Sequence, residues 1–144
     1  MKQQPIAFFF QAPSFYFPNR SRLKLFLLKL IRQEGKSAQS IRIIFCTDEQ
    51  LLHINREYLQ HDYYTDIITF PFSGKSEPLE AELYISIDRI RSNAADWKTT
   101  TQQELHRVIF HGVLHLCGYN DKSSQQIRKM REREDYYLRL YLGK

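Results

Sequence analysis

The order of strand-like and helix-like segments is the feature that most limits what this chain can fold into. Short apolar or β-branched runs predict strands at residues 6–10, 41–46, 65–70 and 82–87. Apolar residues spaced three and four apart predict helices at residues 19–32, 47–59, 88–96, 101–117 and 123–142. Strands and helices do not alternate throughout, because two strands follow each other and three helices close the chain. This order favours an α+β fold, with one mixed four-stranded sheet packed by about five helices, over a doubly wound sheet.

The chain has the size of one domain. It contains 144 residues and no Pro/Gly/Ser-rich run long enough to divide it, so residues 1–144 are expected to form a single domain. Its longest apolar stretch, residues 25–31, is interrupted by Lys29 and falls far short of the ~20 residues of a membrane span. There is no recognisable secretory signal, and Cys46 and Cys117 do not make a disulfide framework. We therefore expect a cytoplasmic protein with no membrane association and no disulfide-linked partner.

Basic residues exceed acidic ones. Lys and Arg number 21 and Asp and Glu number 16, which gives a net charge of +5. This surplus is compatible with binding to nucleic acid or to an anionic surface, and it excludes a strongly basic natural partner. Two interpretations stay open for the basic side chains on the first predicted helix: a solvated face, or a stripe that binds nucleic acid. These residues are Arg20, Arg22, Lys24, Lys29 and Arg32.

Local signals set the expected ends and faces of the helices. Periodicity places Tyr58 on the inward side of the helix at 47–59, and Ile127 on the inward side of the helix at 123–142. The loop between the third and fourth strands contains Gly74 and Pro78, which favours antiparallel pairing of those strands. Pairs of residues three apart predict capping boxes at three helix starts: Thr47 with Gln50, Thr101 with Glu104, and Ser123 with Gln126.

His111 and His115 mark a candidate metal site near the end of the helix at 101–117. Residues four apart on a helix are neighbours, so the two imidazoles lie on one stripe beside the apolar face. Gly118 allows a sharp turn, and Asp121, six residues after His115, is then within reach as a third ligand. Two imidazoles and one carboxylate leave a coordination position open, which is typical of catalytic metal sites. The spacing predicts one divalent transition-metal ion per chain.

Other interpretations of these residues stay open. A His pair at this spacing is often incidental, and Asp121 near a helix start is compatible with a simple cap worth about 1 kcal/mol. Gly112 within a helix costs about 1 kcal/mol relative to Ala and needs a packing reason. Metzincin-type metalloproteases have a similar spacing, but they carry a general-base Glu where this chain has Gly112, so a metallopeptidase is the weaker alternative. Cys117 is expected to be a buried thiol rather than a ligand, and His106 to face elsewhere.

Three blocks of sequence resemble one family. Residues 111–121, HGVLHLCGYND, are similar to the H-G-x-L-H-L-x-G-Y-D-H signature of the YbeY endoribonucleases. Residues 54–71, INREYLQHDYYTDIITFP, are similar to that family's L-N-x-x-Y-R-x-x-D-x-P-T-D-V-L-S-F-P. Residues 81–86, AELYIS, resemble its G-D-I-x-I-S strand. In chain order these blocks cover about residues 51–121.

The resemblance implies a metalloprotein with zinc, or a similar divalent ion, held by the signature. It also implies a metal-dependent, single-strand-specific endoribonuclease that acts in the cytoplasm on ribosomal RNA. The implied tasks are maturation of the 3′ end of 16S rRNA in the small subunit, and ribosome quality control. His111 and His115 would then be catalytic, with a metal that acidifies water and polarises a phosphoryl oxygen. The basic residues of the first helix would hold the RNA backbone.

Several positions depart from the family pattern. Asp121 stands where the family has its third His, Asn120 replaces the preceding Asp, and Ala81-Glu82 replaces Gly-Asp. Leu59 stands where the family has a functionally important Arg. Leu cannot clamp a phosphate as a guanidinium does, so Arg56, three residues earlier on the same helix, is the candidate substitute. The alternative function is a non-catalytic, metal-binding ribosome-assembly factor that has lost cleavage together with the Arg.

Overall fold

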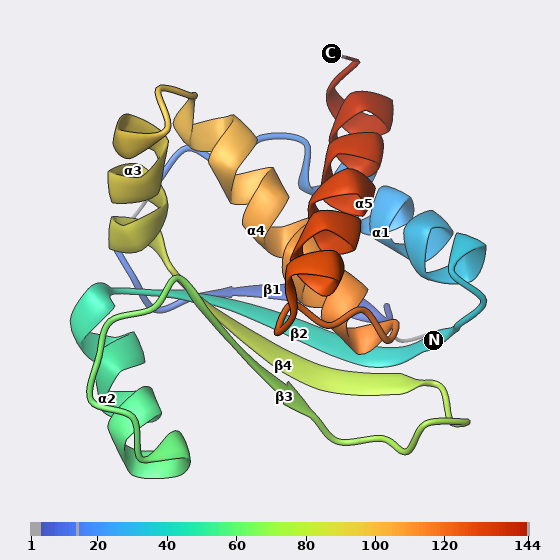
Figure 1. The fold of residues 1–144 in the computed structure, drawn as a ribbon, viewed down its shortest axis with the longest axis horizontal. Helices are drawn as coiled ribbons and strands as arrows, with labels where there is room; N and C mark the ends of the chain where they lie inside the picture. Colours follow the sequence, from blue (N-terminus) through green and yellow to red (C-terminus); the bar gives the residue numbers. More distant parts are fainter. Residues whose placement is uncertain (1–3, 14, 144) are drawn as a thin grey trace.

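A mixed sheet of four strands is the frame of the molecule. The computed structural model describes residues 4–13 and 15–143. Its strands are β1 (Ile6–Phe10), β2 (Ala38–Cys46), β3 (Ile67–Pro71) and β4 (Leu79–Ser86), arranged in the order β1-β2-β4-β3 (Figure 1). β1 pairs with β2 and β2 with β4 in parallel, whereas β3 is antiparallel to β4. The predicted α+β class and the antiparallel pairing across the Gly74–Pro78 loop are therefore confirmed.

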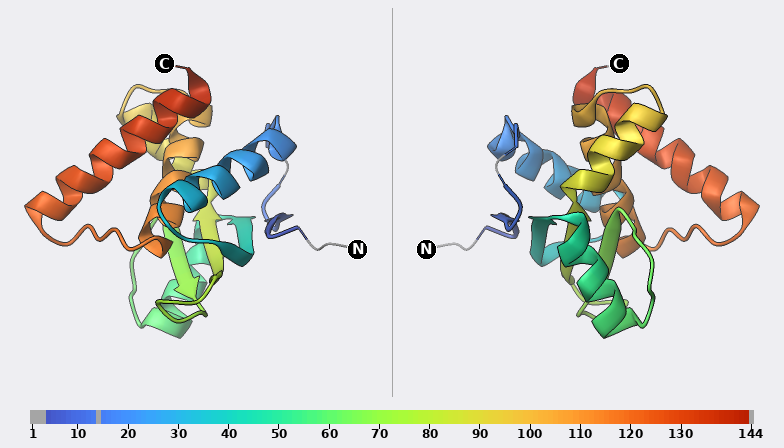
Figure 2. Two further views of the ribbon diagram at one scale, coloured as in Figure 1. Left: turned by 90° about the vertical axis from the view of Figure 1, so that its right-hand side faces the viewer. Right: turned by 90° about the vertical axis from the view of Figure 1, so that its left-hand side faces the viewer.

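Helices cover the two faces of the sheet unequally. Those in the described residues are α1 (Arg20–Gln33), α2 (Asp48–Leu59), α3 (Ile87–Asp96), α4 (Thr101–Leu116) and α5 (Ser124–Leu142). Figures 1 and 2 show α1, α3, α4 and α5 on one side of the sheet and α2 on the other, near one end of β3 and β4. Within the residues described, no helix combines the length and the apolar character needed to cross a membrane.

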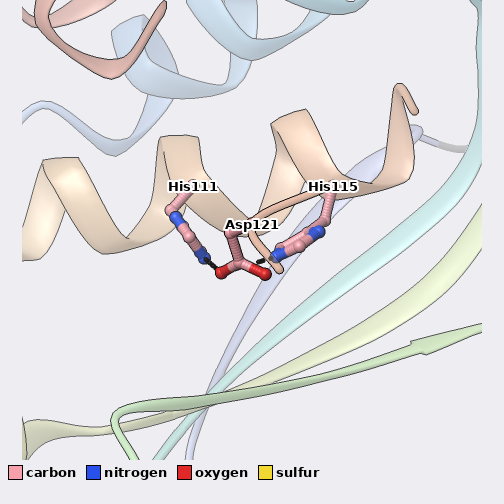
Figure 3. Close-up of side chains that lie close together, drawn as sticks. All are labelled: His111, His115 and Asp121. Atoms are coloured by element: carbon pink, nitrogen blue, oxygen red, sulfur yellow. Dashed lines mark ion pairs between the residues drawn. The ribbon is translucent and has the colours of Figure 1, made fainter. Parts of the chain in front are cut away.

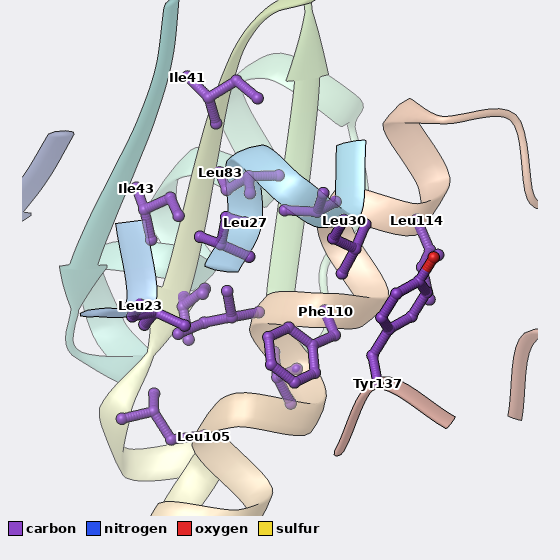
Figure 4. Packing of buried hydrophobic residues seen from close by; sticks show 14 of the residues in the cluster. Leu23, Leu27, Leu30, Ile41, Ile43, Leu83, Leu105, Phe110, Leu114 and Tyr137 are labelled. Carbon is purple, nitrogen blue, oxygen red and sulfur yellow. The ribbon is translucent and has the colours of Figure 1, made fainter. Parts of the chain in front are cut away.

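The main core lies between the sheet and the larger group of helices (Figure 4). Alternation along β4 divides its side chains between the two faces: Leu83 and Ile85 enter the main core, whereas Tyr84 packs against a smaller cluster beneath α2. α4 contributes the largest set of buried residues of any helix, among them Phe110 and Leu114. α4 therefore lies at the centre of the core. This position determines where the two predicted histidines, which lie on the polar edge of α4, stand relative to the sheet.

Gly112 allows α4 to lie close to the sheet. A Cβ atom at this position would lie 2.6 Å from Ile67 Cδ1 and 3.2 Å from Leu83 Cδ2, so the absence of a side chain is what admits β3 and β4. This close contact is the packing reason for a glycine inside the helix. It also brings the adjacent His111 to the cavity that β3 lines.

Three local expectations are wrong, each for a physical reason. The boxes at Thr47 and Ser123 are present, but α4 is capped by Thr100, whose hydroxyl accepts the Gln103 N–H at 3.0 Å, so no box forms at residues 101 and 104. Tyr58 is 72% exposed because its ring contacts only the rim of the sheet, edge-on to Phe70 of β3 with ring centroids 6.1 Å apart, and is not covered from outside. Ile127 is 52% exposed because the start of α5 projects away from the core (Figure 2, left).

Substitution of Gly112 tests the close contact between α4 and the sheet. We expect Gly112→Ala to change the free energy of unfolding by less than about 1 kcal/mol, since better helix propensity offsets the shift of one Ile67 methyl. Gly112→Leu should lower it by about 1–3 kcal/mol or more, because the larger side chain must push α4 away from β3 and β4. Urea denaturation followed by circular dichroism measures both variants. A Leu variant as stable as the parent would contradict this packing.

Candidate metal centre

The structure brings the three predicted ligands together. His111 and His115 extend from α4, and Asp121 extends from the loop between α4 and α5 (Figure 3). Asp121 Oδ2 lies 3.3 Å from His111 Nε2 and 3.4 Å from His115 Nε2. One ligand atom from each residue lies within 4.8 Å of the others. Three donors on two segments thus converge on one point.

The turn after α4 is what returns Asp121 to the helix. The Gly118 N–H donates to the His115 carbonyl at 3.0 Å, and the Tyr119 N–H donates to the Leu114 carbonyl at 3.1 Å. Gly118 has φ +112°, a conformation that L side chains rarely adopt. Ser123, rather than Asp121, caps α5 by accepting the Gln126 N–H at 3.1 Å. The Asp121 carboxylate is therefore not required as a helix cap.

A buried carboxylate orients the first histidine. Glu134 of α5 is 4% exposed, and its Oε2 accepts a hydrogen bond from His111 Nδ1 at 2.6 Å. Its Oε1 accepts a second from Arg107 Nη1 at 2.9 Å. Because Nδ1 is engaged, Nε2 of His111 is the nitrogen that faces Asp121. A carboxylate behind a histidine is the usual outer partner in metal sites, where it fixes the tautomer and raises the basicity of the ligand.

The charges around His111 favour a cation between the donors. Burial lowers the pKa of His111, but the hydrogen bond and charge of Glu134, with the charges of Asp121 and Asp66, outweigh it and raise this pKa above its ordinary value. In the metal-free protein these carboxylates therefore favour the protonated form of His111. A divalent ion supplies positive charge at the same place, and neutral imidazoles with a carboxylate are suitable donors for it. The residues present thus fit a metal ion.

Two cavities meet at this site. The larger, of about 990 Å³, follows β3 and is bounded by the loops before and after that strand and by the end of α4. The smaller, of about 790 Å³, lies toward α3 and α5. His111, Asp121 and Asp66 line both. Partial burial raises the pKa of the Asp66 carboxyl, against the opposing influence of His111, and Asn93 Nδ2 donates to Asp66 Oδ2 at 3.3 Å.

The other predicted contacts lie elsewhere. Arg56 is exposed, pairs with Asp62 at 2.5 Å, and lines neither cavity, whereas Leu59 lines the larger one. None of the basic residues of α1 lines either cavity. Arg20 lies over the Phe10 ring at 4.4 Å, and Arg22 lies over the Tyr141 ring at 4.3 Å. The remaining three are Lys24, which donates to Gln4, and Lys29 and Arg32, both exposed.

The cysteines and His106 are not part of the candidate ligand group. Both cysteines are free, and burial raises the pKa of the Cys117 thiol to about 12, which disfavours the thiolate that binds metals. His106 is buried, with Nδ1 at 2.6 Å from the Gln102 carbonyl oxygen. Four residues of the site carried no motif in the sequence: Glu134, Arg107, and the cavity-lining Lys36 and Lys75. Only Glu134 had a usable signal, a charged residue on the apolar stripe of its helix.

Replacement of Asp121 tests its place in the ligand set. Asp121→Ala should weaken zinc binding by more than the roughly 10- to 100-fold that an outer-shell partner is worth. Asp121→His should retain the ion, and it should shift any pH-dependent cleavage toward lower pH, because loss of the ligand's negative charge lets the ion acidify water more strongly. Competition with a fluorescent zinc chelator measures affinity, with His111→Ala/His115→Ala as the reference for a dismantled site. Undiminished affinity in Asp121→Ala and Asp121→Asn would remove Asp121 from the site.

Glu134→Gln tests the electrostatic coupling in the metal-free protein. A His111 pKa that is raised in the folded state adds stability that is complete below the ordinary value of about 6.5 and is lost as the pH rises through the folded-state pKa. The variant lacks the charge that raises this pKa, so its stability should fall less than that of the parent as the pH rises above the ordinary histidine value of about 6.5. Glu132→Gln, at an exposed position on the same helix, is the control. Parallel stability curves for the parent and Glu134→Gln would refute the coupling.

Known proteins resemble this chain over most of its length. A family model described as Endoribonuclease YbeY matches residues 19–141. A Cytophaga hutchinsonii protein named Endoribonuclease YbeY is 42% identical over 140 residues, which cover 97% of this chain and 98% of that protein. A protein of the same name from Bacteroides thetaiotaomicron is 51% identical over 104 residues, 72% of this chain and 75% of the relative.

A solved structure has the same fold. The solution structure of a Thermotoga maritima protein superposes with a TM-score of 0.70 at 23% sequence identity, covering 96% of this chain and 89% of that one. At this identity the likeness extends to the fold alone. The family match spans both histidines, the turn and Asp121 of the candidate centre. On these grounds, the chain belongs to the Endoribonuclease YbeY family.

Proposed function

We propose that this protein is a metal-dependent endoribonuclease that cleaves single-stranded RNA. The observation that carries the proposal is the convergence of His111, His115 and Asp121 on an open cavity, in a chain whose relatives are named endoribonucleases. A divalent ion bound there supplies Lewis acidity, which makes water more acidic and stabilises negative charge on a phosphoryl oxygen. Both effects assist hydrolysis of a phosphodiester.

The cavity is suited to a negatively charged strand once its metal is bound. Among its lining residues are two lysines, Lys36 and Lys75, and two aspartates, Asp66 and Asp121. With neutral histidines these charges cancel, and a divalent ion makes the lining cationic. The cavity is lined by β3 and by the loops before and after it, so an RNA strand bound there can run alongside β3. Positive charge in such a cavity attracts the phosphates of a single strand.

We assign proton transfer in this site to side chains of the protein, and Asp66 is the candidate because its pKa is raised. Asp66 lines the cavity beside the ligands, and partial burial raises the pKa of its carboxyl, which makes it a better proton acceptor near neutral pH. Glu134 holds the His111 ring in place through Nδ1, and Arg107 holds Glu134. We assign Asp66 the role of the general base, and Glu134 and Arg107 the role of positioning residues.

The substrate, metal and cellular site follow from the family. We infer that the substrate is ribosomal RNA of the small subunit, with maturation of the 3′ end of 16S rRNA and ribosome quality control as the tasks, and that the protein works in the cytoplasm. Zinc is the inferred metal because imidazole donors suit it, and the Asp121 oxygen also admits harder ions such as Mn²⁺. The nuclease names of the relatives support RNA over a peptide substrate.

Cleavage of a labelled RNA strand tests the function. We expect metal-loaded protein to cut single-stranded RNA and to spare the same sequence in a duplex. Activity should disappear with a chelator and in His111→Ala/His115→Ala. Asp66→Asn should retain the metal but cleave roughly 10²- to 10⁴-fold more slowly, as is typical for loss of a general base. Gel electrophoresis and metal analysis of the same preparations give both readouts.

The assay also separates the proposal from the non-catalytic alternative. A ribosome-assembly factor without cleavage would bind metal and RNA but leave the strand intact, with Leu59 in the cavity in place of a guanidinium. Leu59→Arg provides a matched gain-of-function arm: under that alternative it should create cleavage that the parent lacks. If the parent protein cleaves RNA and a chelator abolishes that cleavage, the non-catalytic alternative is excluded.

Replacing lysine and arginine side chains by glutamine tests which surface of the protein binds the RNA strand. Replacement of Lys36 and Lys75 by Gln should reduce the slope of log K against log salt by about 1.4, at roughly 0.7 for each phosphate contact on a single strand. The matching pair Lys29→Gln/Arg32→Gln on α1 tests the prediction that the first helix also contacts RNA, and should reduce the slope by a similar amount. An unchanged slope for either pair shows that those side chains are only solvated.

A further inference from the structure

Two stacked rings stand at the end of the cavity that precedes β3. The His61 and Tyr63 rings have centroids 5.1 Å apart and an interplanar angle of 19°. The Tyr63 hydroxyl lies 2.9 Å from His61 Nδ1, within hydrogen-bond distance. Both residues are exposed, with Tyr63 at 55%, and both line the same cavity as His111, His115 and Asp121. A flat aromatic surface is therefore open to solvent beside the candidate metal centre.

Hydrogen bonds to Asn55 hold the backbone of the loop that carries these rings. Asn55 of α2 is 1% exposed, and its amide Nδ2 donates to the Tyr63 carbonyl at 2.9 Å. The Asn55 backbone carbonyl accepts the His61 N–H at 3.1 Å and also the N–H of Gln60, which adopts a left-handed conformation. A buried polar side chain that hydrogen-bonds to an exposed loop fixes the backbone conformation of that loop. Rings fixed before binding lose little conformational entropy when a ligand contacts them.

The chemistry of this end of the cavity differs from that of the other end. Lys36 and Lys75 lie together near the β3–β4 loop, where Lys36 Nζ donates to the Lys75 carbonyl at 3.3 Å. Beside the rings stands Leu59, which is 40% exposed and also lines the cavity. Phosphates are attracted to the lysines, whereas aromatic rings next to an apolar side chain favour a flat base. A duplex buries its base faces, so only an unpaired nucleotide presents a face that can stack here.

We propose that the His61–Tyr63 ring pair is a stacking platform for one unpaired RNA base next to the metal centre. This subsite rests on the proposed ribonuclease function and deepens it, because it accounts for selection of single strands by a contact that a paired base cannot make. Stacking is tolerant of base identity, since every base has an aromatic face. The platform therefore selects unpaired RNA without demanding a sequence.

Binding of a 2-aminopurine-labelled strand tests the platform. The probe is a short single-stranded 2′-O-methyl RNA titrated with metal-loaded protein, with the label moved one position at a time. We expect one position to show strong fluorescence quenching. Tyr63→Leu and His61→Leu should each weaken binding roughly 5- to 150-fold, the range that corresponds to loss of one base–aromatic stack. Tyr63→Phe keeps the ring and should bind within about threefold of the parent.

Two controls separate stacking from a merely structural role of the loop. Tyr16→Leu removes a ring that is more exposed, at 74% against 55% for Tyr63, and that lines neither cavity, and it should bind as the parent does. An abasic nucleotide at the quenched position should weaken binding to the parent but not to the double variant His61→Leu/Tyr63→Leu, because that variant has no ring left on which the base can stack. Metal affinity and thermal midpoint should be unchanged in Tyr63→Leu.

Distinct results would overturn the proposal. If Tyr63→Leu and His61→Leu bind as the parent does, the ring pair only braces its own loop. If the abasic penalty persists in the double variant His61→Leu/Tyr63→Leu, the rings do not contact the base. If the parent binds no single-stranded RNA at all, the proposed function fails along with the platform, whereas parental binding with unaffected variants rejects the platform alone.

Discussion

The close packing of α4 on β3 and β4 is the constraint on which the rest of the structure depends. The absence of a side chain at Gly112 brings the helix against Ile67 and Leu83, and the same helix fills the main core with its apolar face. Because His111 and His115 lie at the edge of that buried face, the packing that stabilises the fold also fixes two ligands above β3. The cavity then lies between the helix end and the strand. Stability and function share one contact surface.

The carboxylates of the site surround a point where positive charge comes from a proton or from a metal ion. Glu134, Asp66 and Asp121 surround His111, and their charges overcome the effect of burial on its pKa. A buried carboxylate such as Glu134 is unfavourable unless it is paired, and Arg107 and His111 provide its partners. Either a proton on His111 or a bound metal ion supplies positive charge among these carboxylates. The coupling links metal binding to pH and makes α5 part of the centre, although it contributes no predicted ligand.

Sequence patterns were sufficient for the fold class and for the proximity of His111, His115 and Asp121, because both depend on short-range spacing. The i, i+4 histidines and the turn at Gly118 are local features, and they place Asp121 within reach before any tertiary contact is known. The cap of α4 and the exposure of Tyr58 and Ile127 were wrong, since neighbouring threonines compete as caps and periodicity does not reveal where a helix outruns its partner. The role of Glu134 depends on α5 crossing α4, a contact that no local pattern encodes. The cavity-lining Lys36, Lys75 and Tyr63 come from separate loops that only the folded sheet assembles.

The most direct measurement is the zinc K-edge X-ray absorption spectrum of the zinc-loaded protein, because it reports the donor atoms themselves. The account predicts a first shell of nitrogen and oxygen at about 2.0–2.1 Å with outer-shell scattering from two imidazole rings. It also predicts that one of those rings disappears from the spectrum of His115→Ala. A sulfur shell at about 2.3 Å, which would implicate Cys117, or a spectrum with no imidazole scattering, would contradict a centre built from His111, His115 and Asp121.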